Sequence, residues 1–258
     1  VTEAATPIVM QVRPLQEAPV VLSEEPWSID PHVETHAYTD LYQNPCLRLT
    51  LPVGRSTFRY SAIAEVPDAV EPVDVNAPAL PADQLPDDVL IYTLPSRYCV
   101  PEMLADEAVA RFGASAPGYQ QVQQVLDYVW EHVQFQYGST NSLTTAHDVN
   151  VSGLGVCRDF AHLAISFCRA LDIPARYVFG YLPEIDMEPI ANPMDFAAWI
   201  EVWLGDRWWT FDPRNNEQRK GRVLIGRGRD ASDVAMVTAF GMPILESMTV
   251  DAREVTGS

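Results

Sequence analysis

The segment GVCRDFAHL at residues 155–163 decides the fold, because it places Cys157 where a polar loop gives way to an amphipathic helix. Residues 138–156 are polar and rich in turn formers, so we interpret them as the loop. The helix is predicted to end at Pro174 and to bury one apolar stripe, made of Phe160, Leu163, Ala164, Phe167 and Leu171. Free amides and the dipole at the head of a helix favour a thiolate, so Cys157 is a candidate nucleophile. A small buried residue is the alternative, and we assign that role to Cys168.

A second stretch, AAWIEVWLGDRWWTFD at residues 197–212, predicts a hairpin with Gly205 and Asp206 in its tight turn. This turn fixes the register, in which Trp203 faces Trp208, Glu201 faces Thr210, Trp199 faces Asp212, and position 197 faces position 214. Position 197 is then diagonal to Asp212, within reach of a long side chain. We expect the apolar face to pack on the core and the polar, aromatic face to border a cleft; the apolar face comprises Ala198, Ile200, Val202, Leu204, Trp209 and Phe211.

Around these two stretches the sequence suggests three parts. Residues 1–66 alternate like the strands of a small antiparallel β region, and residues 67–90 form a proline-rich linker. Residues 91–258 form the main domain, with helices over about 101–112 and from about 118. Further strands are expected at 176–182, 198–204, 207–212, 234–238 and 244–250.

Composition limits the classes of partner. The 258 residues carry a formal net charge of -18, which argues against nucleic acid and anionic membrane surfaces as partners. No apolar run is long enough for a membrane helix, and the start has no signal pattern, so we expect a cytoplasmic protein. The four cysteines lack zinc-like spacing and are expected to be free thiols; no metal, calcium included, is predicted.

Four blocks in order, GVCRDFAHL (155–163), IPARY (173–177), DFAAW (195–199) and WTFDP (209–213), resemble those of bacterial transglutaminase-like proteins. The similarity spans roughly residues 100–240, and LPSRYC at 94–99 and the strand-rich start also resemble the region that accompanies this core. The combination is far more specific than any one short motif. It implies an α+β fold, with a papain/transglutaminase-like core whose cysteine-bearing helix packs on an antiparallel sheet, preceded by a small antiparallel β region.

The resemblance also implies a Cys-His-Asp triad that needs no cofactor. Cys157 matches the nucleophile and Asp212 the acid that orients the histidine. The histidine itself falls at Ala197, since relatives read Asp-Phe-His-Ala-Trp where this chain reads DFAAW. Alanine can neither accept nor donate a proton, and a positioned base is typically worth about 10²–10⁴-fold in rate.

Other residues were considered as substitutes or as parts of the site. His162 is expected to point away from Cys157 and to be structural, whereas His147 in the loop is a better candidate base that could equally be an ordinary loop residue. Neither His132 nor the pair His32 and His36 has positional support. Glu201 could act as a base, although a solvated cross-strand partner is the simpler interpretation. Asp159 is expected to complement the helix dipole. We expect three tryptophans either to line a substrate channel or to pack at the edge of the core, namely Trp199, Trp203 and Trp208.

Two functions follow from these residues. The first is a cysteine acyl-transferase or an amide or peptide hydrolase that forms an acyl-enzyme at Cys157 with an incomplete triad. The second is a catalytically impaired fold that binds a peptide or protein, and an engineered substitution at Ala197 is a further alternative. The sequence does not choose between transamidation and hydrolysis, and it gives neither the substrate nor the oligomeric state.

Overall fold

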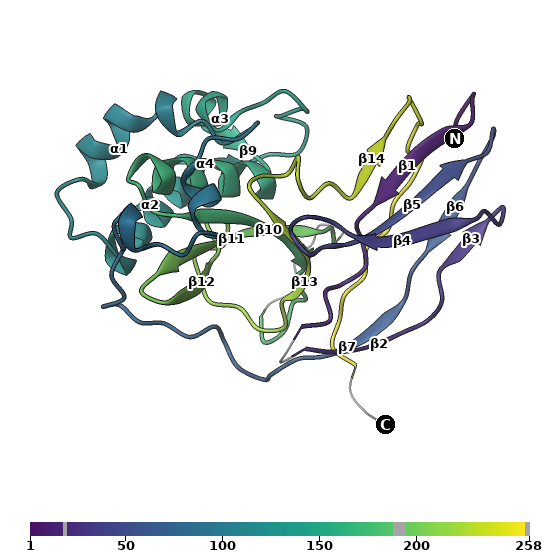
Figure 1. Ribbon diagram of the computed structural model, residues 1–258, viewed down its shortest axis with the longest axis horizontal. Coiled ribbons are helices and arrows are strands. Elements are labelled where there is room, and N and C mark those ends of the chain that lie inside the picture. Colours follow the sequence, from purple (N-terminus) through teal and green to yellow (C-terminus); the bar gives the residue numbers. More distant parts are fainter. Residues whose placement is uncertain (18–19, 188–193, 256–258) are drawn as a thin grey trace.

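The structure is a computed structural model that describes residues 1–17, 20–187 and 194–255. Four α-helices cover one face of a four-stranded antiparallel sheet, while the N-terminal strands lie at the other end of the molecule (Figure 1). The helices are α1 (Ala105–Phe112), α2 (Tyr119–His132), α3 (Ala146–Ser152) and α4 (Cys157–Ala170). Three short 3-10 helices precede α1, namely Ala82–Gln84, Leu90–Thr93 and Pro101–Met103. This is the α+β architecture expected from the sequence.

The central sheet has the strand order β12-β11-β10-β13. Its strands are β10 (Ala175–Tyr181), β11 (Ala197–Leu204), β12 (Arg207–Phe211) and β13 (Val223–Gly228). The predicted hairpin register is confirmed where Trp203 pairs with Trp208 and Glu201 with Thr210, and Gly205 takes the positive φ of 63° that its turn requires. The pairing ends at Phe211, so the chain leaves the sheet just before Asp212.

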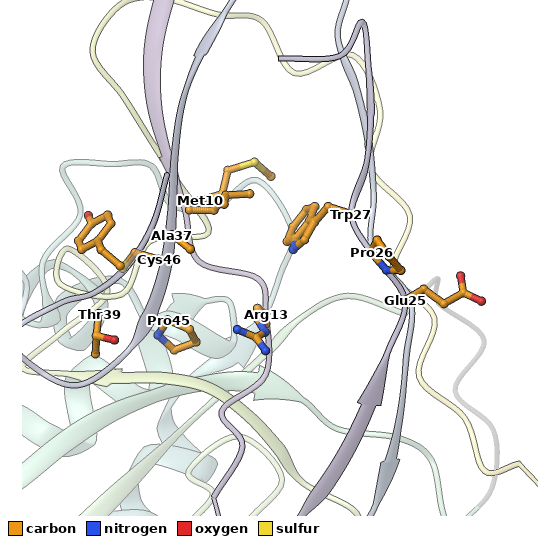
Figure 2. A pocket seen from close by; sticks show the side chains of 11 residues that line it. Met10, Arg13, Glu25, Pro26, Trp27, Ala37, Thr39, Pro45 and Cys46 are labelled. Atoms are coloured by element: carbon orange, nitrogen blue, oxygen red, sulfur yellow. The ribbon is translucent and has the colours of Figure 1, made fainter. Parts of the chain in front are cut away.

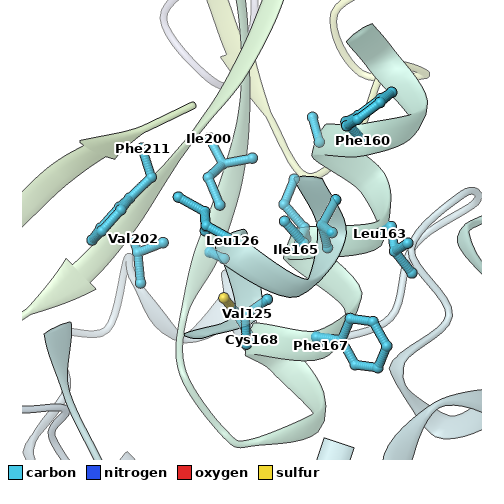
Figure 3. Close-up of a cluster of buried hydrophobic side chains, with 14 of the residues drawn as sticks. Val125, Leu126, Phe160, Leu163, Ile165, Phe167, Cys168, Ile200, Val202 and Phe211 are labelled. Carbon is cyan, nitrogen blue, oxygen red and sulfur yellow. The ribbon is translucent and has the colours of Figure 1, made fainter. Parts of the chain in front are cut away.

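The core lies between α4 and this sheet (Figure 3). Phe160 and Phe167 on α4 are almost fully buried, as are Val125 of α2 and Ile200 of β11. Full burial of such a side chain is worth about 1.5–3 kcal/mol. This packing holds the head of α4 against the start of β11.

The N-terminal region forms a second antiparallel sheet, of order β14-β1-β5-β4. Its strands are β1 (Thr6–Met10), β4 (Thr35–Thr39), β5 (Pro45–Leu51) and β14 (Val237–Ala239), and two further ladders pair β2 (Val21–Glu24) with β7 (Ala62–Glu65) and β3 (Ser28–Asp30) with β6 (Thr57–Arg59). Strand β14 comes from the end of the chain and pairs with β1 (Figure 1). The predicted boundaries between the three parts, at residues 66 and 90, stay a prediction. The sheet nevertheless pairs β14, from the part predicted as the main domain, with the N-terminal strand β1.

Three local predictions were wrong. The predicted loop at 138–156 contains helix α3, which Thr145 caps by accepting the amide N–H of Asp148, and then the strand β9 (Leu154–Gly155), which pairs with β8 (Gln134–Phe135). The strand expected at 244–250 is absent from that described stretch, and β13 was not predicted. The proline-rich segment 67–90 forms neither an α-helix nor a strand, although Ala77 within it is buried in the core.

A cavity of about 580 Å³ opens in the N-terminal region between β5 and the segment that carries Trp27 (Figure 2). Met10, Trp27 and Cys46 are among the residues that line it. Cys157 and Asp212 are not among them, so this cavity is separate from the predicted site. Among the described residues no helix is both long and apolar enough to cross a bilayer.

Candidate functional site

Cys157 is the first residue of α4, directly after the extended residue Val156. Its Sγ lies 3.9 Å from the carbonyl oxygen of Phe196, the residue that precedes β11. The helix head is held by Asp159, whose buried carboxylate accepts the Val156 amide N–H at 2.8 Å and the Thr140 hydroxyl at 2.6 Å. Asp159 therefore has the helix-capping role that its position predicted, and the thiol is fixed against the strand that begins at position 197.

The electrostatics of Cys157 differ from the expectation. Burial raises the pKa of the thiol above its ordinary value of 9.0, and the nearby positive charge of Arg214 only partly opposes this. The amides at the helix head are thus too weak to make Cys157 a thiolate at neutral pH.

Ala197, the first residue of β11, directly follows Phe196, whose carbonyl oxygen lies 3.9 Å from the Cys157 Sγ. It lines a small pocket of about 60 Å³ together with Phe196, Arg214 and Asn215. Position 197 is thus one residue away from the contact with Cys157, and it carries a methyl group where the triad resemblance implies an imidazole.

Asp212 is buried and directly follows β12, and its neighbours Arg214 and Asn215 line the pocket. Its Oδ1 accepts the amide N–H groups of Arg214 and Asn215, at 3.2 and 3.0 Å. Its Oδ2 accepts the Asn215 side-chain amide and the Arg222 guanidinium, both at 2.8 Å. A carboxylate offers about four acceptor positions, so Asp212 is satisfied without a histidine.

Arg222 links Asp212 to a residue that sequence reasoning missed. It forms an ion pair with Glu71, from the predicted linker, and its guanidinium lies 4.9 Å from the centre of the Trp199 ring. Arg214 and Asn215 were missed as well, although they follow Asp212 almost directly in sequence. Glu71 carries no such signal, because it is 141 residues away from Asp212 along the chain.

The three tryptophans do not gather around Cys157. Trp199 is completely buried, so it cannot form the open wall of a channel. Trp203 and Trp208 pack edge to face, with their ring centres 5.4 Å apart, at the turn end of the hairpin. Six residues of strand separate Trp203 from position 197, a distance of about 20 Å. Their surroundings correspond to packing at the edge of the core, and the channel role has no geometric support.

The histidines whose partners the structure gives are engaged away from the thiol. The Nε2 of His162 accepts the Ala231 amide N–H at 3.1 Å, and burial lowers the pKa of His162 to about 4. His132 stacks on Tyr128 and His36 on Tyr38, while His32 is exposed. His147 lies on α3 and not in a loop. Among the described residues no hydrogen bond joins a histidine to Cys157 or Asp212.

Glu201 is not the solvated residue that the sequence suggested. It is buried and forms ion pairs with Arg176 and Arg227, at 2.5 and 3.0 Å. Burial alone would raise the pKa of Glu201, but the two arginines outweigh it and hold that pKa below its ordinary value. A carboxylate held in this way is a poor proton acceptor at neutral pH.

Comparisons with known proteins agree with this arrangement. The model of the transglutaminase-like superfamily matches residues 106–213, a range that contains Cys157, Ala197 and Asp212. A solved structure of a candidate cysteine protease from Cytophaga hutchinsonii is 30% identical, with a TM-score of 0.80, and the match covers 93% of this chain and 81% of that one.

Two curated relatives are uncharacterized mycobacterial proteins. The match to one from Mycobacterium leprae has 36% identity and covers 41% of this chain and 39% of the relative. The match to one from Mycobacterium tuberculosis has 28% identity and covers 59% of this chain and 51% of the relative. The chain thus spans about two fifths to one half of the curated relatives it matches. Since the family model matches residues 106–213 and the Cytophaga protein is 30% identical over 81% of its own chain, the chain belongs to the transglutaminase-like superfamily.

Proposed function

We propose that the chain is a cysteine acyl-transferase or amide hydrolase of low turnover, acting on peptide-like substrates through an acyl-enzyme at Cys157. The observation that carries the proposal is the position of Cys157 at the head of α4, with its Sγ 3.9 Å from the carbonyl oxygen of Phe196, a residue that also lines the small pocket. The protease description of the Cytophaga protein supports the same chemistry. A cytoplasmic site of action remains part of this proposal.

In the reaction the sulfur of Cys157 attacks an amide carbonyl, a C–S bond forms and the C–N bond breaks. The amine leaves with the proton of the thiol. Water or a second amine then takes the acyl group and returns a proton to sulfur. Without an imidazole at position 197 these proton transfers depend on solvent, which explains the low turnover.

An activated acyl donor tests this directly, because it needs little help with the leaving group. Incubation with a phenyl thioester at pH 9 should add one acyl group, located at Cys157 by mass spectrometry. Cys157→Ala should abolish the adduct, while Cys168→Ala, which changes a fully buried thiol, should not. If iodoacetamide alkylates Cys157 under these conditions but no thioester forms, the proposal fails.

The second candidate is a binding module. It is favoured by Asp212, whose acceptor positions are already filled by Arg222, Asn215 and two main-chain amides. A module of this kind would bind peptides equally well with Cys157→Ala and would form no thioester. Peptide affinity, measured by calorimetry alongside the acylation assay, separates the two functions.

A further inference from the structure

Arg214 is one of two arginines that line the small pocket, which lies next to Cys157 through Phe196. Its side chain lines the pocket together with Ala197, and its guanidinium lies 4.2 Å from the centre of the Phe135 ring. Its main-chain amide, not its side chain, donates to Asp212. The Phe135 ring therefore orients the Arg214 guanidinium. The guanidinium that donates to Asp212 is that of Arg222.

The lack of an ion pair sets Arg214 apart from its neighbours. Arg222, Arg227 and Arg229 each form an ion pair with a carboxylate, within a chain that has 35 acidic and only 17 basic residues. Among the ion pairs of the described residues, none includes Arg214. In so acidic a chain, a half-buried guanidinium without a carboxylate partner has free donors for an anion.

Other charged groups also line the pocket, and they limit what it can hold. Asp195 is exposed, and its Oδ1 accepts the Phe196 amide N–H at 2.7 Å. Glu184 and Arg219 complete the charged lining. Arg219 is buried, and its Nη2 donates to the carbonyl oxygen of Pro183 at 3.2 Å. Arg214 is thus the basic residue whose charge reaches the thiol, while Asp195 opposes it.

We propose that Arg214 binds a carboxylate of the acyl donor beside Cys157, so that the site selects peptide-like substrates with an acidic group next to the reacting carbonyl. The inference rests on the proposed function and adds the substrate class. The planar fork of a guanidinium matches a carboxylate through two parallel hydrogen bonds. The substrate anion would thereby be held on the side of the pocket where Arg214 meets Phe135.

Two alkylating reagents of nearly equal size test this, because iodoacetate carries a negative charge and iodoacetamide does not. At a fixed pH, the rate with iodoacetate divided by the rate with iodoacetamide should be higher for Cys157 than for free cysteine. Arg214→Gln should lower it by about fivefold, the effect of one charge at about 4 Å in a water-like medium. Asp195→Asn should raise it. Arg207→Gln, a matched change at the hairpin turn, should leave it unchanged.

A role for Arg214 confined to stabilising the thiolate gives a different result. Both reagents would then slow equally in Arg214→Gln, and the unchanged ratio would overturn the inference. A second measurement uses two tripeptides that differ by aspartate against asparagine. The acidic one should protect Cys157 from iodoacetamide at lower concentration, and Arg214→Gln should remove the difference; equal protection in the unmodified chain overturns the inference too. If iodoacetate is preferred as expected but the phenyl thioester does not acylate Cys157, the proposed function is contradicted and the inference about Arg214 is not.

Discussion

The side-chain amide of Asn215 donates to Oδ2 of Asp212 at 2.8 Å, from the wall of the pocket that also holds Ala197. Asn215 and Ala197 line the same pocket, so the amide occupies one acceptor position of the carboxylate close to position 197. Asp212, which matches the triad acid by resemblance, uses these hydrogen bonds to hold the turn at residues 212–215.

Replacing Arg222 should destabilise the fold strongly. Its side chain and that of Asp212 are 7% and 2% exposed, so Arg222→Met would leave a buried carboxylate without its cation. Loss of one partner of a buried pair typically costs about 3–5 kcal/mol in the free energy of unfolding. Urea titration measures this cost. Arg55→Met, which removes an exposed pair with Glu246, is the control and should have a much smaller effect; equal effects would contradict the buried network.

Alkylation of Cys157 should require high pH. Because the pKa of the thiol is raised above 9.0, the thiolate is scarce at pH 7 and the rate with iodoacetamide should still be rising above pH 9. Arg214→Gln should move the profile further upward, since the opposing positive charge is lost. Stopped assays between pH 6 and 10 give the profile. A plateau reached by pH 7.5 would mean that Cys157 is a poised thiolate.

His162 should make the unfolding free energy depend on pH. Its pKa is about 4 in the folded chain against an ordinary 6.5, so only the unfolded chain binds a proton between these values. This contribution is fully present above pH 6.5 and is lost as the pH falls through 4, with a magnitude on the order of 3 kcal/mol. His162→Gln keeps an acceptor for Ala231 and should flatten this part of the profile. His32→Gln, at an exposed position, should not; a profile unchanged by His162→Gln would contradict the assignment.

The hairpin shows how far local sequence rules reach. Gly205 and Asp206 fix the turn, the turn fixes which residues pair, and alternation then decides that Ile200 packs inward. Helix α4 followed in the same way from its apolar stripe and from Pro174. These features depend on residues close together in the chain, whereas the closeness of position 197 to Cys157 was implied only by the family resemblance.

The missed features depend on contacts across the chain. Strand β13 was not predicted, and it pairs with β10, whose residues lie more than 40 positions earlier in the chain. Glu71 reaches Arg222 from a segment that sequence reasoning treats as a linker. Trp199 alternates onto the polar face, yet other elements bury it completely. Helix α3 was missed for a local reason. Its N-terminal cap, Thr145, stands among polar residues of the kind that also form loops.

We infer that Cys157 and Asp212 are the nucleophile and the acid of a triad whose base position, 197, holds alanine. Ala197→His tests it most directly through kcat/KM for a peptide amide, with Ala197→His/Cys157→Ala as the baseline. We predict a gain of about 10²-fold or more, the usual worth of a positioned base, and a larger gain when Asn215→Ala also frees Asp212. No gain in either folded variant would contradict the claim.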